Sequence, residues 1–139
     1  VLAITCVVLL DASLIAGIDA AYAVKALMLF PVAGRIGSLV GSGVSTYARS
    51  GEGLGKSFIG YCGYREIIAG LVVYFAIFYF IWGMAGVIIS VLPVVTAFIT
   101  VKFLSRKIGG ATGDVLGAVC ELNQTFFLIA VLLVKKYFI

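Results

Sequence analysis

Long apolar runs dominate the chain and are separated by short polar or glycine-containing breaks. An α-helix needs about 20 apolar residues to cross the hydrocarbon of a bilayer, and the runs lack the alternation of a membrane β-strand. The pattern predicts an all-α fold, a polytopic integral membrane helix bundle of about five transmembrane helices in one domain, residues 1–139. The expected spans are roughly 1–18, 20–48, 66–82, 86–104 and 114–134.

The composition also favours a membrane protein. Hydrophobic residues make up 63% of the 139 positions and charged residues only 12%, against about 25% charged in a typical soluble domain. The three cysteines are widely spaced and there is no histidine, which argues against a zinc site and a disulfide framework. The net charge of +4 comes from basic residues that mostly flank apolar runs, so we interpret it as an orientation signal rather than as affinity for nucleic acid.

Two polar loops carry most of these basic residues. Residues 49–65 and 102–113 fall on the same side of the membrane if the predicted spans alternate in direction. The positive-inside rule makes that side cytoplasmic. The turn at 82–86 and the two lysines at 135–136 would then face outward, where the lysines are unexpected.

A polar stripe runs along the second predicted span. Its members are three or four residues apart and therefore share one helix face: Arg35, Ser38, Ser42, Ser45 and Arg49. The glycines at 34, 37 and 41 lie beside the stripe and would permit close helix packing. The serines alone fit a helix–helix seam, but Arg35 is well inside the span and should face the protein interior or a water-filled cavity.

The loop at residues 50–57 (Ser-Gly-Glu-Gly-Leu-Gly-Lys-Ser) approaches the P-loop pattern of nucleotide-binding proteins. A P-loop follows a β-strand in an α/β domain, and no such strand is expected here, so we reject a nucleotide P-loop. The glycines still offer exposed backbone amides, and Arg49 and Lys56 add positive charge. The loop therefore predicts an anion site without a P-loop fold.

Residues 106–121 form the strongest group of polar positions. Thr112 can cap the last helix, with Asp114 in its first turn, where the helix dipole favours an anion. Glu121 shares a face with Asp114 and lies about 10 Å further along the axis. The glutamate could form an ion pair with Arg35 or Arg106. We favour carboxylates that line a polar active-site cavity with basic phosphate-binding groups at its mouth.

These motifs together resemble the cobalamin synthase family, adenosylcobinamide-GDP ribazoletransferase. Residues 47–49 (Tyr-Ala-Arg) lead into a Gly-Leu-Gly loop at 53–55, as in the family. Residues 106–121 carry the family's basic residue, Gly-Gly, Thr-Gly-Asp, Leu-Gly-Ala and glutamate in order. Arg35 matches an arginine about fourteen residues before the first motif. The resemblance covers essentially the whole chain.

The resemblance implies an enzyme of the last steps of adenosylcobalamin biosynthesis. The nucleoside α-ribazole, or its 5′-phosphate, attacks a phosphate of adenosylcobinamide-GDP and GMP leaves, with Mg²⁺ as cofactor. The implied catalytic residues are Asp114, Glu121 and Arg106. The implied phosphate- or substrate-binding residues are Arg35, Arg49, Lys56, Thr112 and Gly113. The implied location is the cytoplasmic (inner) membrane of a bacterium or archaeon, with lipid as a further partner.

The chain departs from the family at one motif. The family's upstream half carries an Asp-Gly-Leu-Ala-Asp motif that is thought to hold the metal, and neither Asp11 nor Asp19 has that context. We therefore expect a fragment that lacks the N-terminal half and is inactive alone, with Asp114 and Glu121 as auxiliary metal ligands at most. Open alternatives are a small transporter or channel subunit, a membrane phosphotransferase for lipid alcohols, and a nonfunctional fragment. A homo-oligomer stays open as well.

Overall fold

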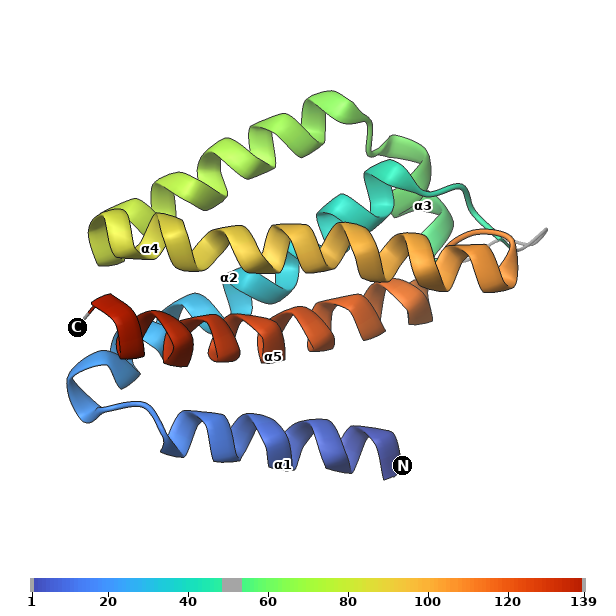
Figure 1. Cartoon of the computed structure of the whole chain (residues 1–139). Coiled ribbons are helices and arrows are strands. Elements are labelled where there is room, and N and C mark those ends of the chain that lie inside the picture. Colours follow the sequence, from blue (N-terminus) through green and yellow to red (C-terminus); the bar gives the residue numbers. More distant parts are fainter. Residues whose placement is uncertain (1, 49–53, 139) are drawn as a thin grey trace.

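The computed structural model describes residues 2–48 and 54–138, which fold into helices joined by short connections (Figure 1). The helices are α1 (Leu2–Ala16), α2 (Ala20–Val44), α3 (Leu54–Tyr61), α4 (Tyr64–Ile108) and α5 (Gly113–Phe138). Within these residues no strand forms, and one isolated bridge pairs Tyr47 with Ala111. The predicted all-α class is confirmed.

Among the described residues, three helices are long and apolar enough to cross a membrane: α2, α4 and α5. They pack against one another and form the core, whereas α1 is a shorter apolar helix whose main contact is with α5. Large apolar side chains also cover the outside of the bundle, for example Val72, Phe80 and Ile99. An apolar exterior around a packed interior is the arrangement of a membrane helix bundle.

Helix α4 turns back on itself at Gly83, within the turn expected at 82–86. Gly83 has φ 66° and ψ −148°, a conformation open mainly to glycine. The helix therefore forms two arms that run in opposite directions (Figure 1). The hydroxyl of Tyr74 on the first arm donates a hydrogen bond to the Ser90 carbonyl on the second arm, at 3.1 Å.

Helices α2 and α5 run antiparallel and meet along the expected row of glycines. A Cβ placed at Gly41 would lie 2.7 Å from Leu116, and one placed at Gly34 would lie 2.9 Å from the Cys120 sulfur. The hydroxyl of Ser38 donates to the Leu116 carbonyl at 3.3 Å. The backbones therefore approach closely, and Ser38 belongs to a helix–helix seam, as one interpretation of the polar stripe predicted.

A buried polar cluster joins all three long helices. Asn123 is only 1% exposed. Its amide nitrogen donates to the Ala33 carbonyl on α2 at 3.2 Å, and its amide oxygen accepts from the Thr96 hydroxyl on α4 at 3.1 Å. The sequence alone predicts no role for Asn123.

Helix α1 is tied to α5 by a second polar contact. Asp11, in the middle of α1, is 8% exposed, and its carboxylate accepts a 2.6 Å hydrogen bond from the Thr125 hydroxyl. Just after α1, a Cβ at Gly17 would lie 3.6 Å from Leu132. The contact with Thr125 gives Asp11 the partner that a polar side chain in an apolar helix needs.

Three expectations about boundaries are wrong. The loop expected at 102–113 begins only after Ile108, because α4 continues to that residue. The second predicted span continues to residue 48, but α2 ends at Val44, because Ser45 is extended (φ −115°, ψ 154°) and the next residues bond to another loop. The segment 49–65 was expected to be a loop, but it contains α3. This helix has eight residues with glycines inside it and near both ends, so loop-like composition concealed it.

Candidate functional site

The structure brings two polar loops together at one end of the bundle. The first loop, residues 45–48, follows α2, and the second, residues 109–112, joins α4 to α5. The amide of Ala111 donates to the Thr46 carbonyl at 2.8 Å, and the amide of Ala48 donates to the Ala111 carbonyl at 3.0 Å. The hydroxyls of Ser45 and Ser105 lie 3.3 Å apart beside them. Segments about sixty residues apart in sequence thus share one short ladder.

Two glycines shape the second loop. Gly109 ends α4 in the left-handed conformation, with φ 76°, and its amide donates to the Ser105 carbonyl. Gly110 has φ 153°, and a Cβ placed there would lie 2.5 Å from the Thr46 carbonyl oxygen and 2.9 Å from the Ala48 nitrogen. A side chain at Gly110 would therefore separate the loops, whereas a Cβ at Gly109 would meet nothing within 4 Å.

The N-terminus of α5 begins directly at this ladder. The hydroxyl of Thr112 accepts a hydrogen bond from the Val115 amide at 3.4 Å, which confirms the predicted helix cap. Gly113 is the first residue of α5, and Asp114 is exposed in its first turn. The partial positive charge of a helix N-terminus thus faces the same end of the molecule as the two loops.

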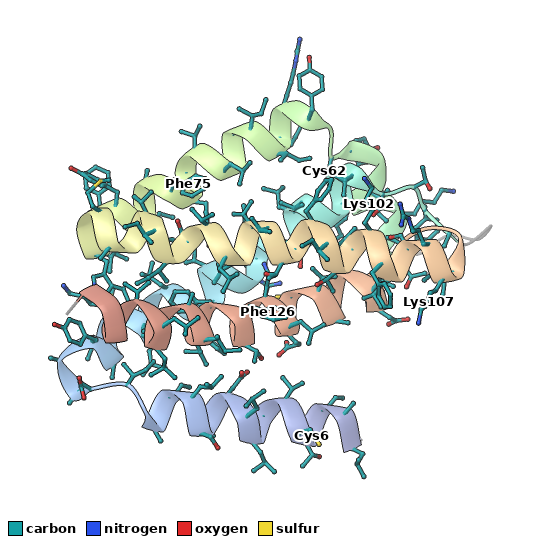
Figure 2. All side chains as sticks on the ribbon, in the orientation of Figure 1. Cys6, Cys62, Phe75, Lys102, Lys107 and Phe126 are labelled. Atoms are coloured by element: carbon teal, nitrogen blue, oxygen red, sulfur yellow. The ribbon has the colours of Figure 1, made fainter. Side chains whose placement is uncertain are left out.

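Several cations lie at the same end. Arg106 is exposed in the last turn of α4. The ammonium groups of Lys102 and Lys107 lie over the rings of Phe98 and Phe103, at 4.9 and 4.6 Å from the ring centres. Figure 2 shows both lysines near the loop end of α4.

Two further basic residues belong to the first motif. Lys56 is exposed on α3, a helix that contacts α2 and α5. Arg49, which was predicted to bind phosphate, lies outside the described residues. The loop end therefore combines backbone amides, a helix N-terminus and exposed basic side chains, which is a suitable environment for a polyanion.

Arg35 and Glu121 are not at this end. Glu121 is exposed on α5, and Arg35 is exposed on α2 nine residues before its last residue, Val44. Among the described residues, Glu121 forms no ion pair with Arg35 or Arg106. The sequence predicted Arg35 and Glu121 as site residues, since each shares a helix face with other polar site residues. Both lie deeper in the bundle than the ladder.

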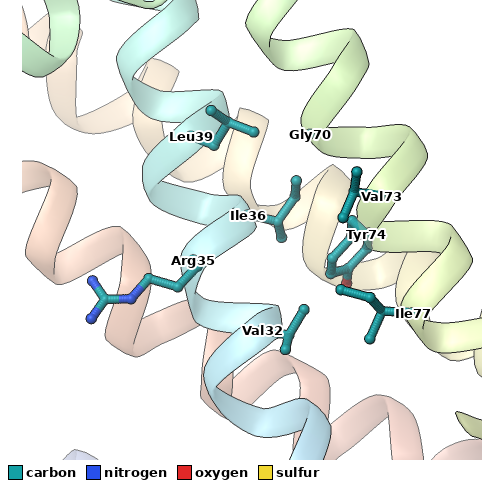
Figure 3. Close-up of a pocket in the computed structure, with 8 residues that line it drawn as sticks. All are labelled: Val32, Arg35, Ile36, Leu39, Gly70, Val73, Tyr74 and Ile77. Carbon is teal, nitrogen blue, oxygen red and sulfur yellow. The ribbon is translucent and has the colours of Figure 1, made fainter.

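A cavity of about 320 Å³ opens between α2 and the first arm of α4. Its lining is almost wholly apolar and consists of Val32, Arg35, Ile36, Leu39, Gly70, Val73, Tyr74 and Ile77. Figure 3 shows the Arg35 side chain pointing away from the other lining residues. The cavity therefore offers no cluster of charges for a phosphorylated substrate.

The described residues do not fit a magnesium site on their own. No three cysteine, aspartate or glutamate side chains in the described part of the chain lie close enough to hold one ion. Asp114 and Glu121 are seven residues apart, which is about 10 Å along the helix, so they do not share one ion in this fold. A metal would need ligands from elsewhere.

Comparison with known proteins agrees with the motifs. The sequence profile of the cobalamin-5-phosphate synthase family matches residues 1–132. The chain is 56% identical over 135 residues to the adenosylcobinamide-GDP ribazoletransferase of Acetivibrio thermocellus, covering 97% of this chain and 54% of that protein. It is 54% identical over 131 residues to the protein of the same name from Clostridium acetobutylicum, covering 94% of this chain and 52% of that protein.

The match covers only part of each relative. The chain spans about half the length of these two relatives. No solved structure matches the fold. The profile match covers nearly all of the chain, and the identities to both relatives exceed half of the aligned positions. The chain therefore belongs to the cobalamin-5-phosphate synthase family.

Proposed function

We propose that this chain forms part of an adenosylcobinamide-GDP ribazoletransferase, which completes the nucleotide loop of adenosylcobalamin. One observation carries the proposal: the ladder that joins residues 46–48 to Ala111. It fastens the Tyr-Ala-Arg motif to the Gly-Gly-Ala-Thr-Gly-Asp motif. These two motifs carried the resemblance. A helix bundle that served only as a membrane anchor would not require a contact between them.

The proposed reaction is a phosphotransfer. A hydroxyl of α-ribazole, or of its 5′-phosphate, attacks the cobinamide-linked phosphate of adenosylcobinamide-GDP, a new phosphodiester forms, and the bond to the leaving phosphate of GMP breaks. Most of the catalysis in such reactions comes from positioning and charge stabilisation. The loop end offers both, through a rigid glycine loop and a group of cations.

Each residue has a proposed role. Arg106 and Lys56 are exposed at the loop end and would bind phosphate oxygens, together with Arg49. Thr112 and Gly113 would set the α5 N-terminus against the substrate. Asp114 would accept a hydrogen bond from a substrate hydroxyl.

The deeper residues and the metal complete the proposal. Glu121 and Arg35 would line the inner part of the same polar region in the complete enzyme. We keep Mg²⁺ as the cofactor of the complete enzyme, with its main ligands outside this chain, and we assign it no step here.

Location and partners follow from the same picture. The cations and the glycine loops gather at one end of a membrane bundle. The positive-inside rule favours the cytoplasmic side for that end, and the cytoplasm is where a nucleotide-linked substrate is available. We therefore propose the cytoplasmic membrane of a bacterium or archaeon, with substrates entering from the cytoplasm.

A chimera tests the proposal. In this chimera the chain replaces the matched part of the Acetivibrio thermocellus relative, so that the rest of that protein completes it. We expect Mg²⁺-dependent release of GMP from adenosylcobinamide-GDP when α-ribazole is added. Arg106→Ala should reduce the rate by about 10²-fold or more, as expected when a group that stabilises transition-state charge is removed. Asp114→Asn should reduce it by about 10²-fold or more, because the carboxylate that accepts from the attacking hydroxyl is lost.

Lys25→Ala is the control, because it removes an exposed basic side chain from the first half of α2, away from the loop end. It should retain most of the rate. Near-normal turnover in both site variants would contradict the site, and a chimera that inserts in the membrane but never releases GMP would contradict the function. A transporter would instead move a solute across vesicles without turnover of adenosylcobinamide-GDP.

A further inference from the structure

Arg35 and Glu121 lie on the same open face of the bundle. Gly34 and Cys120 face each other across the seam of α2 and α5. Arg35 and Glu121 each follow one residue later, which turns both side chains about 100° around their helices. Because the two helices are antiparallel, both rotations lead to the same side, and both side chains are exposed there.

Both side chains lie near the middle of the membrane. Glu121 is eight residues after Gly113, about 12 Å from the start of α5, and Arg35 is nine residues before Val44, about 14 Å from the end of α2. The hydrocarbon layer is about 30 Å thick. Lipid is a costly environment for charge at this depth, and glutamate lacks the long side chain by which lysine and arginine reach the interface.

Helix α1 leaves part of this face open. Asp11 on α1 accepts a hydrogen bond from Thr125, and a Cβ at Gly17, just after α1, would lie 3.6 Å from Leu132; both of these α5 residues follow Glu121. The stretch of α5 before Glu121 stays open, with Gly117 and Ala118 exposed. The open face is therefore bounded by α1, α2 and the loop end.

Gly117 has no packing role within the described chain. A Cβ placed there would meet nothing within 4 Å, whereas a Cβ at Gly34, Gly37 or Gly41 would press against α5 or α4. Glycine inside a helix lowers the stability of that helix relative to alanine. A glycine that no internal contact requires is typical of a helix whose backbone is approached closely from outside.

We infer that this face, formed by Arg35, Gly117, Ala118 and Glu121, is the docking surface for a transmembrane helix from the part of the protein that lies outside the match. Almost half of each relative's length lies outside the match, and it needs a surface on this bundle. The charges of Arg35 and Glu121 exclude lipid from this face. The inference rests on family membership and not on the proposed reaction.

The chemistry of the face defines the contact side of that helix. Small residues must cross α5 at Gly117, so that the backbones meet. A carboxylate or carbonyl must lie within reach of the Arg35 guanidinium, and a hydrogen-bond donor must face Glu121. A second copy related by a two-fold axis along the membrane normal would set each Arg35 against the Glu121 of the other copy, so a dimer of this chain is the competing outcome of the test.

Photo-crosslinking in the chimera tests the contact. A photoreactive benzoylphenylalanine replaces Ala118, and a cleavage site for a specific protease separates this chain from the rest of the relative. After irradiation and cleavage, the two parts should stay joined. The matched control places the same group at Val95, which is 47% exposed on α4, and there the parts should separate.

The other products of that experiment overturn the inference. A crosslinked dimer of this chain would identify a second copy as the occupant, and adducts with lipid alone would show an uncovered face. A second measurement guards against a misfolded crosslinking variant. Gly117→Ala should raise the unfolding midpoint of the isolated chain, because the added methyl group meets nothing, but should lower it in the complete chimera.

A rise of similar size in both proteins would exclude close approach at Gly117. Both readouts are independent of turnover. The contact can therefore be refuted while the reaction stands, and the reaction can fail while the contact stands.

Discussion

Substitution of Gly110 by alanine should separate the two motif loops. Gly110 has φ 153°, and the new Cβ would lie 2.5 Å from the Thr46 carbonyl oxygen. Keeping the loop in place would cost the strain of a backbone conformation that alanine avoids, about 1–3 kcal/mol, in addition to the steric overlap. Moving the loop away instead would break the two ladder hydrogen bonds, which contribute about 0.5–1.5 kcal/mol each.

The loop should move away rather than keep the strained conformation, because displacement costs less free energy. We therefore expect Gly110→Ala to lower the free energy of unfolding by about 1–3 kcal/mol, the value of the two lost hydrogen bonds. Purified protein in mixed micelles would be titrated with sodium dodecyl sulfate, and helix content would be followed by circular dichroism. In the chimera the same substitution should also lower the rate of GMP release. The loss of rate should exceed the loss of folded protein, because the motifs lose their relative position.

Gly109→Asn is the matched control. Gly109 also has positive φ, but at 76° it lies in the left-handed helical region that asparagine tolerates, and a Cβ there meets nothing within 4 Å. It should unfold and react nearly as the unsubstituted protein does. Equal effects of the two substitutions on stability and turnover would refute the idea that the ladder positions the motifs.

Three other expectations follow from the described contacts. Asn123→Ala and Thr96→Val should each destabilise the bundle, and the double variant should show a coupling of about 0.6 kcal/mol, at most about 1.7; strictly additive losses would mean that their hydrogen bond contributes nothing. Thr125→Val should weaken the attachment of α1, whereas Asp11→Asn should be tolerated because it keeps the acceptor oxygen; the reverse order in the detergent titration would contradict this. Burial and, to a lesser degree, the nearby Glu66 carboxylate raise the pKa of the Cys62 thiol, so less thiolate is present at neutral pH. Alkylation of Cys62 should reach half its maximal rate at a pH above the ordinary thiol pKa of about 8.5. Half-maximal alkylation at or below that pH would show an exposed thiol.

The helices could be predicted from the sequence because the thickness of hydrocarbon sets the length of an apolar run. The reversal at Gly83 and the cap at Thr112 were also accessible, since glycine and threonine have strong local preferences. Helix α3 was missed, because in eight residues the glycines outweigh the periodicity of the apolar positions.

The site could be predicted only in part. The motifs supplied the residues at the loop end, but the ladder is made by backbone groups of Thr46, Ala48 and Ala111, and backbone groups leave no signature in residue type. The contact of Asn123 with Thr96 was hidden for another reason. A polar residue in an apolar run signals that a partner exists without naming it.

The one-residue reversal at Gly83 makes the two ends of the bundle differ in the length of their connections. At the end opposite the loops, the chain reverses within a single glycine in α4 and within a few residues between α1 and α2 (Figure 1). Three residues separate α1 from α2 there, and the two arms of α4 meet at Gly83 without a loop. All the variation in length that the family tolerates in this region should therefore collect at the loop end, and an insertion at the Gly83 end should be rejected even though it lies far from the proposed chemistry.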